Sequence, residues 1–254
     1  MLSQVEIAEF DELGYLVVPG ALALAEVEVA RAAFGRLAER ARALSAPTLV
    51  DGALFVVRRP EGAPVQIERI VWCGAVEPVL GELGRANALV TRAAQLLGGP
   101  EMDQLINQAH IKSPGDGVEF HFHQDSYHRR YGTELFTDVN GRGSFVQALT
   151  ALDPMGPENG GMWVIPKSHR LGHIPTSDGR LPEGLFDPKD AHAVHLEPGD
   201  TLLMGPFTVH GSEPNRGKTE RRLFINGFCC PGANKRMYPG AGTGLRVRAW
   251  VSAA

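Results

Sequence analysis

The chain has 254 residues, of which 43% are hydrophobic and 21% charged, and its formal net charge is -4. This composition is typical of a globular protein, and the mildly acidic balance without a basic run argues against a nucleic-acid partner. The absence of an apolar stretch of 18 residues argues against a membrane-spanning helix. Three cysteines without disulfide or zinc spacing, and a charged, amphipathic start unlike a signal peptide, favour a cytoplasmic location.

The first hundred residues have mainly helical character. Ser3 followed by Glu6 predicts a capped helix that ends near Leu13, and "YLVV" after it predicts a short strand. Residues 21–44 are rich in Ala, Glu, Arg and Leu at helical spacing, and residues 77–97 predict two more short helices. We therefore expect residues 1–100 to form a mainly helical support.

From about residue 102 the pattern changes to short apolar or alternating runs between turns rich in Gly and Pro. These runs predict eight or nine strands, among them "QLINQAHIK", "EFHFHQD", "SFVQALTAL", "GMWVIP", "DTLLMGP", "TVHGSE", "RRLFINGFC" and "LRVRAWV". Such a series is typical of a sandwich or barrel. We expect an α+β fold in a single domain, 1–254. Its catalytic core would be a jelly roll, or cupin-like double-stranded β-helix, over 101–254, flanked by the N-terminal helices.

Two long segments, 131–142 and 176–189, contain few strand-forming residues. Loops of this length in a compact domain often act as lids or binding loops. The sequence does not assign either role.

The stretch "FHFHQD" offers three candidate metal ligands, His121, His123 and Asp125. On a strand, all three would point to the same face, about 6.5 Å apart from one to the next. Metal–ligand bonds of roughly 2.1 Å let adjacent members share an ion, but not the outer two, which lie about 13 Å apart. Strand geometry thus leaves two pairs open: His121 with His123, or His123 with Asp125.

A set of two histidines and one carboxylate is typical of non-heme Fe(II) oxygenases. His210 in "TVHGSEPN" is the best candidate for the second histidine. By itself, His-x-Asp is a weak signal, because a surface carboxylate beside a core histidine gives the same triplet.

Five motifs that follow one another along the chain make the assignment more specific than His-x-Asp alone. They are "HQD", "ENGGMWVIPKSH", "EPGD", "HGSEPN" and "RR". Together they resemble the phytanoyl-CoA dioxygenase family of Fe(II)/2-oxoglutarate oxygenases, most clearly over residues 100–230 and more weakly at "QIERI". The resemblance implies that His123, Asp125 and His210 ligate Fe(II) and are the catalytic residues. His121 is then a residue of the pocket rim, a support for the ligands or a spare.

The resemblance also implies a binding site for the cosubstrate, 2-oxoglutarate. Arg221 would hold its distal carboxylate, a role that suits the planar, permanently charged guanidinium. Ser212 matches the family position whose hydroxyl helps to bind the same carboxylate, and Arg69 aligns where some members carry a lysine. Strand alternation directs Arg222 to the opposite face from Arg221.

The activity implied is hydroxylation of an aliphatic carbon of a small molecule, using O2 and releasing succinate and CO2. Related halogenases lack the carboxylate ligand, and Asp125 is present here. Desaturation and ring closure stay open. The alternative of another class is a cupin-like, metal-dependent non-oxygenase, such as an isomerase or a small-molecule binding protein. A catalytically silent scaffold is the third possibility.

Several residues are candidates for substrate contact. Gln108, His110 and Lys112 alternate on one predicted strand face, which either lines the mouth of the active site or is simply exposed. Tyr127 and Trp163 lie near the motifs, although the apolar strand around Trp163 favours core packing. Arg129, next to Arg130, would receive an anionic substrate group or belong to a solvated loop.

Overall fold

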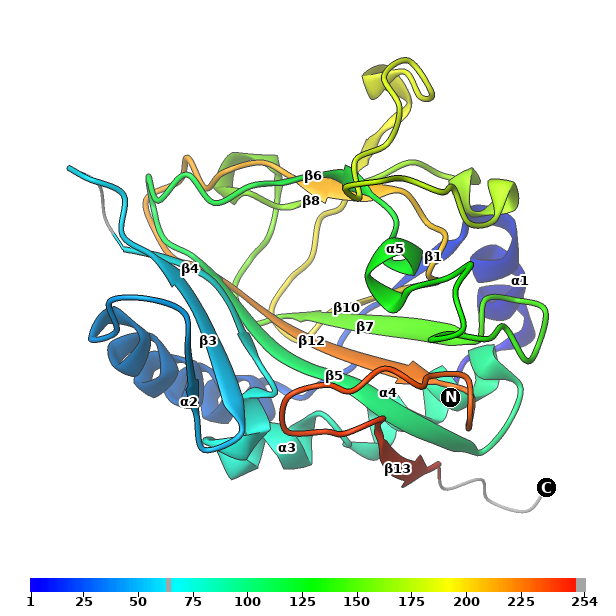
Figure 1. The fold of residues 1–254 in the computed structure, drawn as a ribbon, viewed down its shortest axis with the longest axis horizontal. Helices are drawn as coiled ribbons and strands as arrows, with labels where there is room; N and C mark the ends of the chain where they lie inside the picture. Colours follow the sequence, from blue (N-terminus) through cyan, green and yellow to red (C-terminus); the bar gives the residue numbers. More distant parts are fainter. Residues whose placement is uncertain (63–64, 250–254) are drawn as a thin grey trace.

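The computed structural model describes residues 1–62 and 65–249. Two antiparallel β-sheets face each other, and most helices lie under the larger sheet (Figure 1). Among the described residues, the larger sheet has nine strands. Their order is β1 (Tyr15–Val18), β10 (Thr201–Met204), β7 (Phe145–Ala151), β12 (Arg221–Cys229), β5 (Glu101–Lys112), β4 (Gln66–Val71), β3 (Ala53–Arg58) and β2 (Thr48–Val50), with β13 (Leu245–Arg248) also paired to β5.

The smaller sheet carries the histidine motifs. Within the described part of the chain it has four strands, in the order β6 (Phe120–His123), β11 (His210–Ser212), β8 (Met162–Val164) and β9 (His192–Ala193). The arrangement of two facing sheets with flanking helices is the predicted α+β jelly roll, and this fold class is confirmed.

The helices follow the predicted order. They are α1 (Gln4–Leu13), α2 (Leu24–Arg42), α3 (Pro78–Leu83), α4 (Asn87–Leu97) and α5 (Asp125–Arg129), with 3-10 turns at Cys73–Ala75, Pro157–Asn159, Ser168–Leu171 and Pro188–Asp190. Ser3 and Glu6 form the predicted capping box of α1, and Gly14 ends the helix with a φ of 86°.

Side-chain alternation on β12 separates the core from the cavity between the sheets. Phe224 faces the helices, and its ring meets Phe34 of α2 edge to face, with 6.0 Å between centroids. Leu223 and Ile225 face the other way and line the cavity. The large sheet is therefore packed against helices on one face and forms the cavity wall with the other.

The front of the chain differs from the prediction of a mainly helical support. Strands β2, β3 and β4 (Thr48–Val71) extend the large sheet beyond β5 and add to the cavity wall. Burial alternates along β3, with Phe55 and Val57 buried and Val56 half-buried, but the continuous apolar run of residues 53–57 shows no such alternation in the sequence. The predicted strand at 245–251 is present as β13, whereas Trp250 and Val251 lie outside the described residues.

Among the described helices, none has both the length and the apolar character needed to cross a bilayer.

Candidate active site

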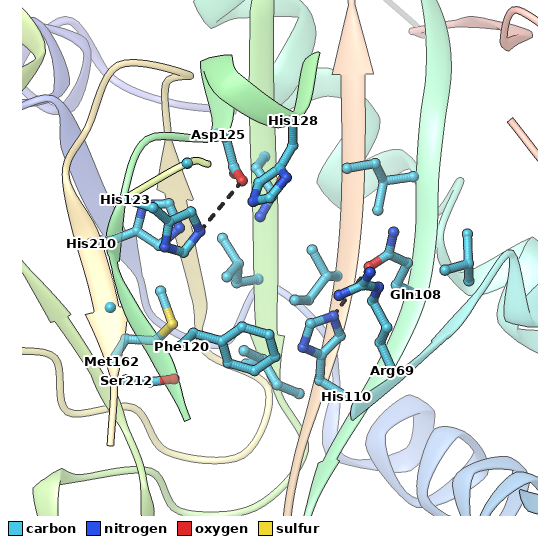
Figure 2. A pocket seen from close by; sticks show the side chains of 18 of the residues that line it. Arg69, Gln108, His110, Phe120, His123, Asp125, His128, Met162, His210 and Ser212 are labelled. Atoms are coloured by element: carbon cyan, nitrogen blue, oxygen red, sulfur yellow. Dashed lines mark hydrogen bonds and ion pairs between the residues drawn. The ribbon is translucent and has the colours of Figure 1, made fainter. Parts of the chain in front are cut away.

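Three side chains converge where the small sheet meets α5. β6 and β11 are antiparallel neighbours with His123 opposite His210, and Asp125 is the first residue of α5. One potential ligand atom from each residue lies within 4.8 Å of the other two. Figure 2 shows the two imidazoles side by side with the carboxylate above them. The geometry suits one metal ion.

Hydrogen bonds prepare both imidazoles for metal binding. Nδ1 of His123 donates to the His121 carbonyl at 2.7 Å, and Nδ1 of His210 donates to the Thr208 carbonyl at 2.9 Å. A carbonyl oxygen can only accept, so both Nδ1 atoms carry the proton and both Nε2 atoms keep a free lone pair. His123 Nε2 lies 3.9 Å from a carboxylate oxygen of Asp125.

The protonation states also fit a metal centre. Burial and the neighbouring His210 lower the pKa of His123 to about 3, which keeps this imidazole neutral at physiological pH. Burial opposes ionisation of Asp125, but His210, His123 and Arg129 together lower the pKa of its carboxyl group. Asp125 Oδ2 is buried without a hydrogen-bond partner among the described residues. An unprotonated imidazole and an ionised carboxylate with an unpaired oxygen are the forms that bind a divalent cation.

The three candidate ligands of "FHFHQD" do not lie on one strand, as the sequence analysis assumed. β6 ends at His123, and the chain turns into α5, so Asp125 belongs to a helix. His121 reaches only the cavity rim, where its side chain is 59% exposed and 3.5 Å from Glu119. The structure therefore brings together the predicted set of His123, Asp125 and His210.

One end of the cavity is rigid and cationic. Arg221 is 2% exposed and donates from Nη2 to the Gly160 carbonyl at 2.6 Å, while its Nε is buried without a partner among the described residues. Ser212, on β11 of the small sheet, lines the same cavity. Burial lowers the pKa of Arg221 to about 10, so the group stays charged near neutral pH. An unpaired, charged donor beside a hydroxyl fits a carboxylate.

Lys112 supports this end instead of the predicted active-site mouth. Its Nζ donates to Ser212 Oγ at 2.8 Å and to the Glu213 carbonyl at 2.5 Å, and the residue is 1% exposed. Its partner in the strand register is Arg221. Burial, and then the charge of Arg221, lower the pKa of Lys112 to about 6. The amine of Lys112 is bonded to Ser212 and does not line the cavity, so the substrate contact of Lys112 stays a prediction.

Arg221 and Arg222 point to opposite faces, as alternation predicts. Arg222 pairs with Asp153 through Nη2 at 2.6 Å and is half-buried.

Arg69, Gln108 and His110 line the wall formed by the large sheet. Nε2 of His110 and Oε1 of Gln108 are 3.1 Å apart. In Figure 2 these three side chains lie across the cavity from Ser212 and the histidine pair. Burial lowers the pKa of Arg69. Gln108 and His110 occupy the predicted surface, whereas the cosubstrate role of Arg69 stays a prediction.

Two of the predicted substrate residues are outside the cavity. Trp163 alternates with Met162 on β8, and Met162 is the one that lines the cavity. Tyr127 instead packs against the loop at Gly179 and donates to the Ser177 carbonyl at 3.4 Å. Neither side chain lines the cavity in this structure, and the substrate contact of both residues stays a prediction.

Arg129 does line the cavity and is 6% exposed, whereas Arg130 is exposed to solvent. Tyr238 and Gln147 line the same space of about 510 Å³. The sequence analysis missed both residues. Gln147 was identifiable in principle, because it alternates with Val146 and Ala148 on a predicted strand, but Tyr238 comes from an irregular segment without a motif.

Comparison with known proteins gives a family match over most of the chain. A family model described as phytanoyl-CoA dioxygenase matches residues 10–223. The ectoine dioxygenase of Sphingopyxis alaskensis is 30% identical over 235 residues, which cover 84% of this chain and 71% of that protein. The dioxygenase lolE1 of Epichloe uncinata is 31% identical over 78 residues, and this match spans only 30% of its length.

Solved structures share the fold at lower identity. EvdO2 from Micromonospora carbonacea var. aurantiaca, complexed with 2-oxoglutarate, has a TM-score of 0.68 at 22% identity, with 94% of this chain and 96% of that chain covered. The non-heme alpha ketoglutarate dependent epimerase SnoN has a TM-score of 0.65 at 21% identity, with coverage of 89% and 82%.

Proposed function

The chain belongs to the phytanoyl-CoA dioxygenase family of Fe(II)/2-oxoglutarate-dependent oxygenases, and from this premise we propose that it hydroxylates an aliphatic carbon of a small molecule. The balanced reaction joins substrate, O2 and 2-oxoglutarate to give the alcohol, succinate and CO2.

One observation carries the proposal. His123, Asp125 and His210 each offer one potential ligand atom, and these atoms lie within 4.8 Å of one another. The Nδ1–H groups of both histidines are bonded to backbone carbonyls, and Oδ2 of Asp125 is unpaired among the described residues. Three protein ligands leave coordination positions open on an octahedral ion, as an oxygenase requires. A structural metal site would close the coordination shell with protein groups.

The iron and 2-oxoglutarate, when bound, supply the oxidising chemistry. The chain supplies position and charge. Arg221 and Ser212 would receive the distal carboxylate of the cosubstrate through charge-assisted and hydroxyl hydrogen bonds. Lys112 fixes the Ser212 hydroxyl from behind. The apolar walls around Leu149, Met162 and Ile225 exclude water from the reacting carbon.

A metal-dependent protein that is not an oxygenase would have no role for Arg221. A buried guanidinium with an unpaired Nε, on the same cavity as a metal triad, is costly unless an anion binds there. Epimerisation, the activity in SnoN's name, shares the cosubstrate site with hydroxylation, so the two outcomes separate only at the product.

Anaerobic titration of the protein with Fe(II) and then 2-oxoglutarate tests the proposal. We expect the weak visible charge-transfer band of the chelate, and loss of that band in Asp125→Ala. Protein that binds iron without developing the band would overturn the cosubstrate assignment. For the reaction type, ¹⁸O2 should label the product of a hydroxylase and leave that of an epimerase unlabelled.

A further inference from the structure

The Arg129 guanidinium is a buried charge that forms no direct ion pair or hydrogen bond within the described structure. The residue is 6% exposed, and both Nε and Nη1 are buried without a hydrogen-bond acceptor among residues 1–62 and 65–249. Buried arginines are normally paired, because desolvating a charge is unfavourable unless an acceptor compensates it. The side chain faces the active-site cavity. It therefore has unused hydrogen-bonding capacity inside the space where a substrate would bind.

Two aromatic rings hold this guanidinium in place. Its central carbon lies 5.4 Å from the Phe145 ring centroid and 5.2 Å from that of Tyr238. Cation–π contacts of this kind stabilise the charge but occupy no N–H group. The N–H groups remain free for a planar acceptor, and a carboxylate matches the guanidinium fork.

The position of Arg129 relative to the metal ligands limits the distance to the reacting carbon. Asp125 and Arg129 are four residues apart on α5, so their side chains leave the same helix face one turn apart. An anionic group held by Arg129 would place the rest of a small molecule next to the metal triad. A long acyl chain is not required to span the two points.

A second unpaired group lies beside this position. Gln147 is two residues from Phe145 on β7, hence on the same strand face and roughly 6.5 Å along it. Its Oε1 is buried without a donor among the described residues. Arg129 offers N–H donors and Gln147 offers an acceptor, which together suit a ligand that carries both an anion and a hydrogen-bond donor.

We propose that Arg129 binds the carboxylate of a small substrate that also carries an N–H or O–H group directed at Gln147; this assignment rests on the proposed oxygenase function. A singly charged carboxylate fits better than a phosphate dianion, because Arg129 brings one positive charge, flanked by aromatic rings, to this position.

Ligand-observed NMR on Zn(II)-loaded protein saturated with 2-oxoglutarate tests the proposal without turnover. Saturation with 2-oxoglutarate occupies the Arg221 end, so that probes report on the remaining cavity. The probes are L-pyroglutamate, N-acetylglycine and benzoate, each compared with its neutral primary amide, and inorganic phosphate. At least one carboxylate should bind about tenfold more tightly than its amide, as expected for a charge-assisted hydrogen bond. L-Pyroglutamate and N-acetylglycine, which have N–H donors, should bind more tightly than benzoate.

The variants identify the responsible group. Arg129→Gln should reduce the preference for the carboxylate to within about twofold, and Arg129→Lys should keep part of it, because the charge remains. Arg130→Gln is the matched control and should behave like wild type, since Arg130 is exposed. A panel in which no carboxylate binds better than its amide, or in which phosphate binds best, would overturn the inference.

The visible band of the Fe(II)–2-oxoglutarate complex separates the two proposals. Wild-type protein without the band would contradict the oxygenase function itself. A normal band without carboxylate preference would contradict only the role of Arg129. Loss of the band in Arg129→Gln would show that this arginine serves the cosubstrate and would also overturn the inference.

Discussion

Two buried arginines in one cavity are held in different ways. Arg221 lies on the long central strand β12, donates to a backbone carbonyl and neighbours the Lys112–Ser212 hydrogen bond. Arg129 lies on a helix of five residues and is held by the faces of two aromatic rings. The first end of the cavity is fixed by the hydrogen bonds of a sheet. The second depends on a short helix and on Tyr238 from an irregular segment.

This difference matches the two kinds of ligand that we propose. A cosubstrate of constant shape is best bound by groups fixed in a rigid sheet, because little ordering is left to the binding step. A site built on loops and short helices changes specificity more readily. Substitutions at each end, and at the metal ligands between them, show how far the two ends are independent.

The largest effect should follow from removing a ligand of the metal ion, on which both ends of the cavity depend. His210→Ala deletes one of three metal ligands, and we expect Fe(II) affinity to fall by about 100-fold or more and succinate release to disappear. Competition with a metal indicator measures the affinity. Retention of wild-type iron binding would show that the ion is held elsewhere.

Arg221→Gln should damage only the cosubstrate end. We expect 2-oxoglutarate affinity to fall by about 30- to 1000-fold, in line with the 2–4 kcal/mol typical of truncating one partner of a buried charged pair. Titration of the visible band gives this value, and iron affinity should change little. An unaltered dissociation constant for 2-oxoglutarate would mean that another cation, such as Arg69, holds the distal carboxylate.

Lys112→Met should give a smaller change that depends on pH. In the free protein the pKa of Lys112 is lowered to about 6, by burial and by Arg221. Neutralising Arg221 with a bound dicarboxylate should raise this pKa, so that binding takes up a proton. Affinity for 2-oxoglutarate should therefore increase as the pH falls from 8 to 6, and level off below about 6.

Calorimetry in two buffers of different ionisation enthalpy measures this uptake. The Lys112→Met variant should lose the uptake, and the exposed Lys167→Met should retain it. Identical binding enthalpies in both buffers for the wild type would exclude a titrating Lys112.

His121→Ala should have the smallest effect. The side chain is 59% exposed at the rim, so iron and 2-oxoglutarate affinities should both stay within about twofold of wild type. His123→Ala is the comparison and should lose iron. If the two variants lost iron equally, the wrong pair of ligands would have been chosen from "FHFHQD".

The sequence by itself predicted most of the architecture and the three candidate metal ligands. Alternation identified the later strands, the capping box identified α1, and the ordered motifs selected His123, Asp125 and His210. These features are encoded locally or as spacings along the chain. The strands at Thr48–Val71 were missed because they are short and weakly patterned, and they are completed only by pairing with β5 through β4.

The tertiary structure alone decided the roles of similar neighbours. Arg129 and Arg130 are adjacent and identical in type, yet one is buried in the cavity and the other is exposed. Lys112 was expected either at the mouth of the active site or on an exposed strand face, and it is instead buried and bonded to Ser212, a hundred residues away in the chain. The burial of a side chain and its hydrogen-bond partners depend on segments that are distant in the chain and come together only on folding. Spacing along one segment therefore predicts which way a side chain points, but not what it meets there.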